Sequence, residues 1–312
     1  MREKMRIGIF IGSLGAADSL EGHVQQVVDA EKDGFDSLWS AQVLGVDALT
    51  LFALAGQRTQ RIEMGTGVVP TYPRHPTALA QQALTTNAAT RGRLALGIGL
   101  SHRPVVEQRF GMSFEKPALH MQEYLTVLKK LVHDGSADFH GEVFNVNADI
   151  QVPDASPFPI LVAALGPKML SIAGELAEGT VTWMVGLKTL RTHIVPRINS
   201  AAEKAGREQP RVCVGLPIAV TDDRQKARQV ANELFHRYGR LPSYRRMLDI
   251  EGVESSVDVA VMGNETEVED QLRALADAGA TDFMAAIFPT DGDEEASAAR
   301  TRSLLKGLVG KI

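Results

Sequence analysis

The sequence has little cysteine and little net charge, and both shortages exclude classes of protein. A single cysteine among 312 residues rules out a disulfide within the chain. Cys213 sits in the apolar run at 211–220, which predicts a buried, unreactive thiol and suits a reducing cytoplasm. The net charge is −5, and no long run of Lys or Arg occurs. We therefore expect no nucleic-acid partner, because neutralising phosphates requires a basic patch.

Long hydrophobic runs are also absent. No apolar stretch approaches the roughly 18 residues that a membrane-spanning helix needs, so no membrane partner is expected. The N-terminal sequence MREKMRIGIF enters a strand directly, without the apolar segment and cleavage site of a signal peptide. With 44% hydrophobic and 23% charged residues, the composition is that of an ordinary globular protein, which we expect in the cytoplasm.

Strand-like and helix-like segments alternate along the whole chain. Short apolar runs are followed by longer stretches in which apolar residues recur at helical spacing. This alternation predicts an α/β fold, a (β/α)8 TIM barrel that residues 1–312 form as a single domain. An open doubly wound sheet is the alternative, because sequence periodicity cannot show closure. The expected strands lie at 6–11, at 35–40, within 62–70, within 91–104, and at 159–164, 180–184, 211–220 and 281–288.

Three other segments add detail to this barrel. Residues 135–157 alternate apolar and polar side chains about Gly141, which predicts a β-hairpin or extended insertion before the fifth strand. The polar helical region 223–248 is expected to divide at Pro242. The helix at 47–55 is apolar nearly all round, so it must be covered on more than one side, either by a second subunit or within one chain.

Glycines recur near the C-terminal ends of the third and fourth strands. A glycine inside a strand marks either a bulge or a place where the backbone must approach something closely. A flat ring of a ligand is one explanation, and simple bulges are the other. A dinucleotide-binding turn is excluded, because Pro70 and His102 stand where its third glycine would be. The glycines are Gly65, Gly67, Gly97 and Gly99.

In a barrel, the residues that follow each strand face one mouth. The sequence ALGPK at 164–168 ends the fifth strand and opens a helix, whose free N–H groups could bind a phosphate with help from Lys168; an ordinary helix start needs the same Gly-Pro. None of the eight histidines pairs with a carboxylate at metal-ligand spacing, so no metal is expected. Four aromatic residues could line the mouth or belong to the core: Phe10, Tyr72, Trp183 and Phe288.

Several of these motifs together resemble the bacterial luciferase-like monooxygenase superfamily, and within it the branch that uses the deazaflavin coenzyme F420. The resemblance spans most of the chain and implies a (β/α)8 barrel with an inserted segment, usually a homodimer, that binds a flavin-like ring and a small-molecule substrate at the C-terminal mouth. FMN is the alternative cofactor. The motifs are GFDSLW at 34–39, GTGVVPTYPRHPTALAQQALT at 65–85, RGRLALGIGLSHRPVVE at 91–107, ALGPKM at 164–169 and DAGATDF at 277–283.

The resemblance also implies positions for the cofactor. Gly67-Val68 matches a non-proline cis peptide behind the ring, the loop from Gly99 to Ser101 lies beside the ring, and the loop at 164–168 takes the tail and phosphate. The implied cofactor-binding residues are Gln42, Gly67, Val68, Gly99, Leu100, Ser101, Ala164, Leu165, Gly166, Pro167 and Lys168.

One departure from the family pattern affects the chemistry. Dehydrogenases of this branch commonly carry a proton-transferring histidine after the second strand, but Gln42 and Val43 stand there, and neither can be a general acid or base. Among the remaining mouth residues, His102 is the best candidate proton donor and Tyr72 the second. The expected function is hydride transfer between coenzyme F420 and a small organic substrate. An FMN-dependent monooxygenase and a non-catalytic flavin- or deazaflavin-binding protein are the alternatives.

Overall fold

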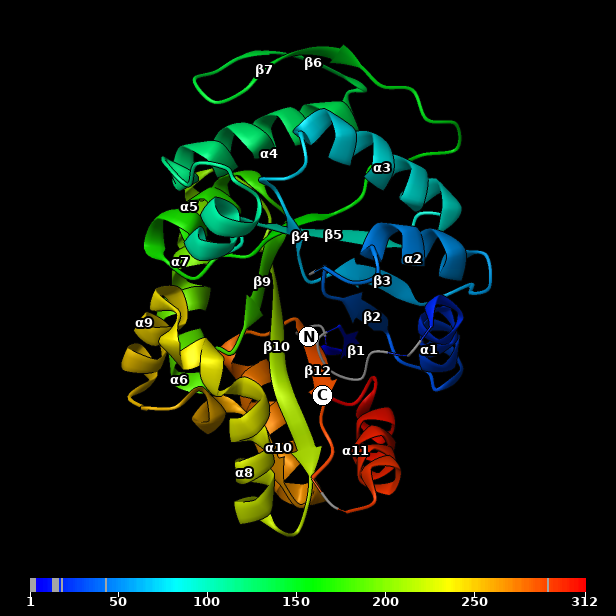
Figure 1. Cartoon of the computed structure of the whole chain (residues 1–312), viewed down its shortest axis with the longest axis vertical. Helices are drawn as coiled ribbons and strands as arrows, with labels where there is room; N and C mark the ends of the chain where they lie inside the picture. Colours follow the sequence, from blue (N-terminus) through cyan, green and yellow to red (C-terminus); the bar gives the residue numbers. More distant parts are fainter. Residues whose placement is uncertain (1–3, 13–16, 18, 43, 291) are drawn as a thin grey trace.

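The structure is a computed structural model that describes residues 4–12, 17, 19–42, 44–290 and 292–312. Its main sheet is a closed barrel of eight parallel strands, seen at the centre of Figure 1. The sheet closes because β9 pairs with β10, β10 with β12, and β12 with β1. The barrel prediction is confirmed and the open sheet is excluded. The barrel strands are β1 (Arg6–Ile11), β2 (Ser37–Ser40), β3 (Glu63–Thr66), β5 (Leu94–Gly99), β8 (Ile160–Val162), β9 (Gly179–Trp183), β10 (Arg211–Val220) and β12 (Asp282–Ile287).

Helices surround the strands (Figure 1). Their ends follow local signals: Asp47 caps α2 by accepting a hydrogen bond from Thr50 N–H at 2.8 Å, and Pro76 occupies the first turn of α3. The surrounding helices are α1 (Leu20–Lys32), α2 (Ala48–Gly56), α3 (Pro76–Ala89), α4 (Pro117–His133), α5 (Pro167–Leu176), α7 (Val195–Lys204), α10 (Glu265–Ala278) and α11 (Glu294–Leu308). The short α6 (Leu187–Thr189) leads into α7 through the π-helical turn η2 (Leu190–Ile194).

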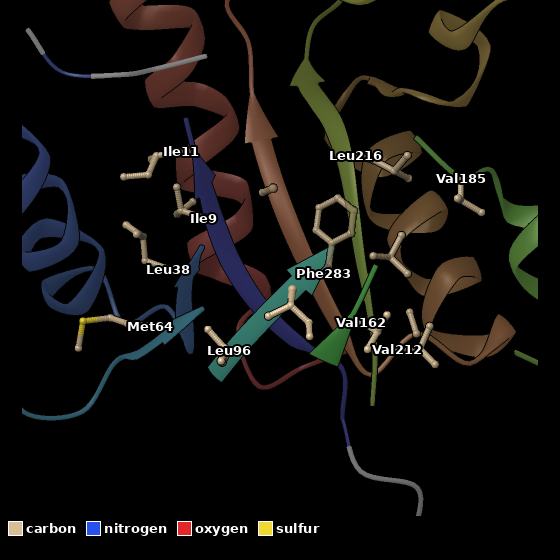
Figure 2. Packing of buried hydrophobic residues seen from close by; sticks show 14 of the residues in the cluster. Ile9, Ile11, Leu38, Met64, Leu96, Val162, Val185, Val212, Leu216 and Phe283 are labelled. Atoms are coloured by element: carbon tan, nitrogen blue, oxygen red, sulfur yellow. The ribbon is translucent and has the colours of Figure 1, made fainter. Parts of the chain in front are cut away.

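The buried apolar residues form two clusters because each strand is covered on both faces. The larger cluster lies between the strands and the helices and includes Ile9, Leu38 and Leu96 (Figure 2). The smaller cluster fills the inside of the barrel. Cys213 belongs to it and is 0% exposed, and burial raises the pKa of its thiol, as expected for an unreactive core cysteine. The inner cluster consists of Trp39, Ala95, Leu161, Val181, Cys213 and Met284.

The insertion expected at 135–157 contains a hairpin that is not part of the barrel sheet. Strands β6 (Ser136–His140) and β7 (Asn145–Asp149) pair antiparallel and lie outside α4 (Figure 1). Glu123 on α4 ties the hairpin turn down, because its carboxylate accepts hydrogen bonds from the N–H groups of residues 142, 143 and 144 at 2.9, 2.8 and 2.9 Å.

A second excursion lies between β10 and β12. The polar helical region divides at Pro242 as expected, into α8 (Arg224–Phe235), the 3-10 turn η3 (His236–Arg240) and α9 (Pro242–Glu251). It is followed by η4 (Ser256–Val259) and by β11 (Val261–Gly263), which pairs in parallel with the last three residues of β10. The sequence gives no sign of β11, because three residues are too few to show a period.

Helix α2 packs against α1 and α3 within the chain. Most of its apolar residues are buried there, and Leu54 is the large exception at 46% exposed. Packing inside one chain therefore accounts for most of its apolar surface. In the described part of the chain, no helix is both long and apolar enough to cross a membrane.

Candidate active site at the barrel mouth

Phe10 and Val68 close the inner cluster on the side where the strands end. Both are partly buried and pack against it. The Gly67–Val68 peptide bond is cis, at the position where the family resemblance implies one. A Cβ atom added at Gly67 would lie 2.8 Å from Phe10 Cε2, and one added at Gly99 would lie 2.6 Å from Val68 Cγ2. These four residues therefore form one closely packed layer, which we call the platform.

Gly65 and Gly97 lie deeper, and close approach by a ligand ring is the wrong explanation for them. A Cβ atom at Gly65 would overlap the indole ring of Trp39, and one at Gly97 would overlap the backbone oxygen of Thr66. The protein itself fills the space beside both glycines. They are required by packing inside the barrel, which the sequence cannot reveal because Trp39 comes from the neighbouring strand β2.

Gly99 joins three of the predicted segments. Its carbonyl oxygen accepts a hydrogen bond from Thr71 N–H at 2.9 Å, just after the short strand β4 (Val69–Pro70). A Cβ atom there would lie 3.2 Å from Ala163 Cβ, immediately before the 164–168 loop. Leu100 and Ser101 follow, half-buried, and Ser101 has a φ of 62°. The structure thus brings the platform, the 99–101 loop and the start of the 164–168 loop together.

The 164–168 loop ends in an uncapped helix start. Gly166 precedes α5 without any side-chain cap, and nothing lies within 4 Å of the position that its Cβ would take. The N–H groups in the first turn of a helix have no partner within the helix. Lys168 is exposed and makes no ion pair with any described residue. The Leu165 carbonyl is already occupied, because it accepts a hydrogen bond from His193 Nε2 at 2.7 Å. This start offers N–H donors and a cation to an anionic group.

Gln42 has a structural task of its own. Its side-chain oxygen accepts a hydrogen bond from Ala48 N–H at 2.7 Å, at the start of α2. Its amide N–H groups and the second lone pair of that oxygen are left to serve a ligand. Val43 lies outside the described residues.

His102 and Tyr72, the two candidate proton donors, belong to different clusters of rings. His102 is half-buried, its ring centroid lies 5.8 Å from that of Tyr244 on α9, and burial lowers its pKa. Tyr72 is 7% exposed and lies between Phe114 and His120, with centroid distances of 5.3 and 4.1 Å. Burial raises its pKa, and its hydroxyl has no hydrogen-bond partner among the described residues.

Of the other candidate wall residues, Phe288 belongs to the core and Trp183 does not. Phe288 is 0% exposed and packs edge-on against Phe235. Trp183 is partly exposed and lies 5.3 Å from Phe10 between ring centroids, yet its Nε1 atom is buried and finds no acceptor in the described part of the chain. Nothing in the sequence places Tyr244 near His102; the only hint is that two of the four tyrosines lie close together around Pro242.

The mouth therefore fits a cofactor with a ring and an anionic tail. It offers a packed platform, an uncapped helix start and two buried donors without acceptors, Tyr72 Oη and Trp183 Nε1. Two surface hollows of about 570 Å³ each lie elsewhere, one between α10 and α11 and one beside α3, α4 and residues 150–157. Among the described residues, no group of three or more His, Cys, Asp or Glu side chains could hold a metal ion.

Comparison with known proteins agrees with this geometry. A sequence profile of the luciferase-like monooxygenases matches residues 5–282. The chain is 27% identical over 308 residues to a Mycobacterium tuberculosis protein whose name places it, provisionally, among the coenzyme F420-dependent oxidoreductases; the alignment covers 93% of this chain and 87% of that relative.

Two solved structures share the fold. One is an F420-dependent secondary alcohol dehydrogenase in complex with an F420-acetone adduct, with a TM-score of 0.79 and 18% identity over 96% of this chain and 98% of that one. The other is the oxygenating constituent of 3,6-diketocamphane monooxygenase from Pseudomonas putida in complex with FMN, with a TM-score of 0.75 and 18% identity over 98% and 97% of the two chains. Because the family profile covers most of the sequence, this chain belongs to the luciferase-like monooxygenase family, as its motifs predict.

Proposed function

We propose that this protein is an oxidoreductase that uses coenzyme F420 and acts on a small organic substrate at the barrel mouth. One observation carries the proposal: the uncapped start of α5, with the exposed Lys168, lies at the same end of the barrel as the platform. The start of α5 suits a phosphate-bearing tail, and the platform suits a planar ring. The name of the Mycobacterium tuberculosis relative supports this cofactor.

The deazaflavin, when bound, would supply the hydride chemistry at its carbon 5. The protein's own residues would hold and orient it. Gly67 and Val68 would support the ring, and Leu100 and Ser101 would lie beside it. The α5 N–H groups and Lys168 would take the phosphate, with the Gln42 amide as a further donor.

We assign proton transfer with the substrate to His102 in preference to Tyr72. His102 is half-buried, and neither ring nitrogen hydrogen bonds to a described residue, so both remain available. Tyr72 is covered by Phe114 and His120, and burial raises its pKa. A general acid or base must reach the proton that it moves, which favours the more accessible group.

An FMN-dependent monooxygenase is the second candidate, since a structure of similar fold contains FMN. Titration of the purified protein with coenzyme F420 and, separately, with FMN distinguishes the two. We expect saturable, tighter binding of coenzyme F420, followed by turnover with a substrate panel. Binding of FMN alone would overturn the proposal, and binding of coenzyme F420 without turnover over a broad panel would favour a non-catalytic carrier.

Three further points belong to this proposal. We propose that residues 1–312 act as one domain with an insertion at about 135–157, that two copies form a homodimer, and that the protein works in the cytoplasm. The buried thiol of Cys213 suits a reducing compartment, and the exposed Leu44 and Leu54 offer apolar surface to a second copy. Sedimentation of the purified chain and cell fractionation test the last two points.

A further inference from the structure

A continuous row of aromatic rings runs along part of the barrel mouth. Trp183 at the end of β9 lies 5.8 Å from Tyr238 on η3, with the rings edge to face. Tyr238 lies 5.4 Å from Tyr244 on α9, again edge to face, and Tyr244 lies 5.8 Å from His102 after β5. Phe10 on β1 extends this row at its other end, with its ring centroid 5.3 Å from that of Trp183. Rings in such contacts present apolar faces and edges that favour other planar groups.

Hydrogen bonds between α9 and α6 hold in place the part of this row of rings that lies on α9. The carboxylate of Glu251, at the end of α9, accepts hydrogen bonds from Lys188 N–H and Thr189 N–H at 3.0 and 2.7 Å. The hydroxyl of Thr189 donates to the Met247 carbonyl oxygen at 3.0 Å. These bonds join α9 to the start of α6, which directly follows the β9 loop. Tyr244 is therefore positioned by the fold and does not depend on a ligand for its place.

Trp183 adds one hydrogen-bond donor, its indole N–H, to this apolar surface. An indole N–H can only donate a hydrogen bond, and a buried donor without an acceptor is unfavourable. Trp183 Nε1 is such a donor among the described residues, although the residue as a whole is partly exposed. A ligand oxygen or nitrogen at the mouth would supply the missing acceptor.

We infer that Trp183, Tyr238 and Tyr244 form a specificity-determining wall for a planar, largely apolar substrate that carries a hydrogen-bond acceptor, and that Trp183 Nε1 donates to this acceptor. The inference rests on the proposed function, because it places the substrate at the mouth beside the cofactor. It selects against two kinds of molecule: flexible aliphatic compounds, which cannot stack on the wall, and planar hydrocarbons, which leave the indole N–H without an acceptor.

The test compares three probes of equal carbon count on the full-length protein saturated with coenzyme F420: acetophenone, ethylbenzene and 2-octanone. Isothermal titration measures each affinity. We expect acetophenone to bind about tenfold more tightly than either of the others, since each of them lacks one of the two recognised features. Equal binding of all three probes would overturn the inference.

Two variants separate the two features. Trp183→Phe keeps a ring but removes the N–H, so it should abolish the preference for acetophenone over ethylbenzene and keep the preference over 2-octanone. Tyr244→Leu should abolish the preference for acetophenone over 2-octanone and keep the preference over ethylbenzene. Tyr244→Phe is the matched control, because it keeps the ring, and should bind like the parent protein. Variants that retain the parental order of affinities, with an unchanged circular dichroism spectrum, would overturn the assignment.

Failure of the proposed function gives a different result. Coenzyme F420 binding is measured first, by a separate titration. If the cofactor does not bind, the proposed function is wrong, and the same probe comparison on the protein alone still tests the wall. If the cofactor binds and the three probes bind with equal affinity, the inference of an aromatic wall is wrong and the proposed function stands.

Discussion

Arg211 and Asp282 form a partly buried ion pair at the end of the barrel opposite the mouth, with 2.6 Å between Arg211 Nη2 and Asp282 Oδ1. Arg211 also reaches Glu63 at 2.8 Å, and Arg6 reaches Glu63 and Asp282 at 3.0 and 3.5 Å. Burial by itself would raise the pKa of Asp282, but Arg211, together with Arg6 and the Thr281 hydroxyl, more than offsets burial, so the pKa is lowered. Two cations and two carboxylates therefore close this end of the barrel.

The first prediction concerns this pair. Asp282→Asn should lower the free energy of unfolding by about 1–3 kcal/mol, because Arg211 loses its closest carboxylate while Glu63 remains beside it. Urea unfolding measures the change. Asp222→Asn is the control: its side chain is 77% exposed and pairs with Arg300 at the surface, where solvent screens the interaction, so the loss should be much smaller than in Asp282→Asn. Equal losses in the two variants would contradict this account.

The second prediction concerns the uncapped start of α5. Lys168→Met should weaken binding of coenzyme F420 by about tenfold, because a charge-assisted hydrogen bond to the phosphate is lost. Binding of the deazaflavin core without its phosphate-bearing tail should be nearly unchanged. Fluorescence titration with both ligands measures the difference, and Lys311→Met, at an exposed lysine near the C-terminus, is the control. Equal weakening for both ligands would remove the phosphate role.

The third prediction concerns His102. His102→Ala should slow turnover by about a hundredfold and leave cofactor affinity nearly unchanged, as expected for a group that acts mainly in the transition state. Tyr72→Phe should have a much smaller effect. The measurements are cofactor affinity and turnover rate with a working substrate. Unchanged turnover would exclude His102 from proton transfer, whereas an equal fall in affinity would make it a binding residue.

If His102 transfers the proton as proposed, it should also give the reaction a pH dependence. Burial lowers its pKa, so the neutral imidazole predominates above its usual pKa of about 6.5. In the direction of substrate oxidation, the neutral imidazole accepts the proton, so kcat/KM should fall as the pH drops through a midpoint below about 6.5. This acid limb should be missing in His102→Gln.

The fourth prediction concerns the stability of the Tyr72 and His120 cluster. Burial lowers the pKa of His120 from 6.5 to about 4. Between these values the unfolded chain binds the proton and the folded chain does not, so the free energy of unfolding rises with pH across this window and falls on acidification. The loss can reach about 3 kcal/mol. Urea unfolding across the window should show a flatter dependence in His120→Gln, and parallel profiles for the two proteins would contradict the assignment.

The barrel could be predicted from the sequence because its signals are local. The bounds of β1 and β10 agree with the expected apolar runs at 6–11 and 211–220. The expected third strand is split, since the chain leaves β3 after Thr66 and pairs again only at Val69. Helix α4 begins at Pro117, because proline fits the first turn of a helix.

The mouth could be predicted only in part. The family motifs indicate the platform and the α5 start, but the path of α9 depends on contacts such as Glu251 with Thr189, which join segments far apart in the chain. The place of Tyr244 beside His102 follows from that path. Side chains that meet through tertiary packing leave no mark on local sequence periodicity.

The contact between Trp39 and Gly65 has a consequence for how this family can vary. One indole occupies, inside the barrel, the space that a side chain on the adjacent strand would need. The two positions thus share a single volume, and enlarging residue 65 requires a smaller residue 39. Relatives should therefore exchange bulk between these positions in a correlated way. Because the inner cluster supports Phe10 and Val68, such an exchange would also change the height of the surface on which we propose that the cofactor ring rests.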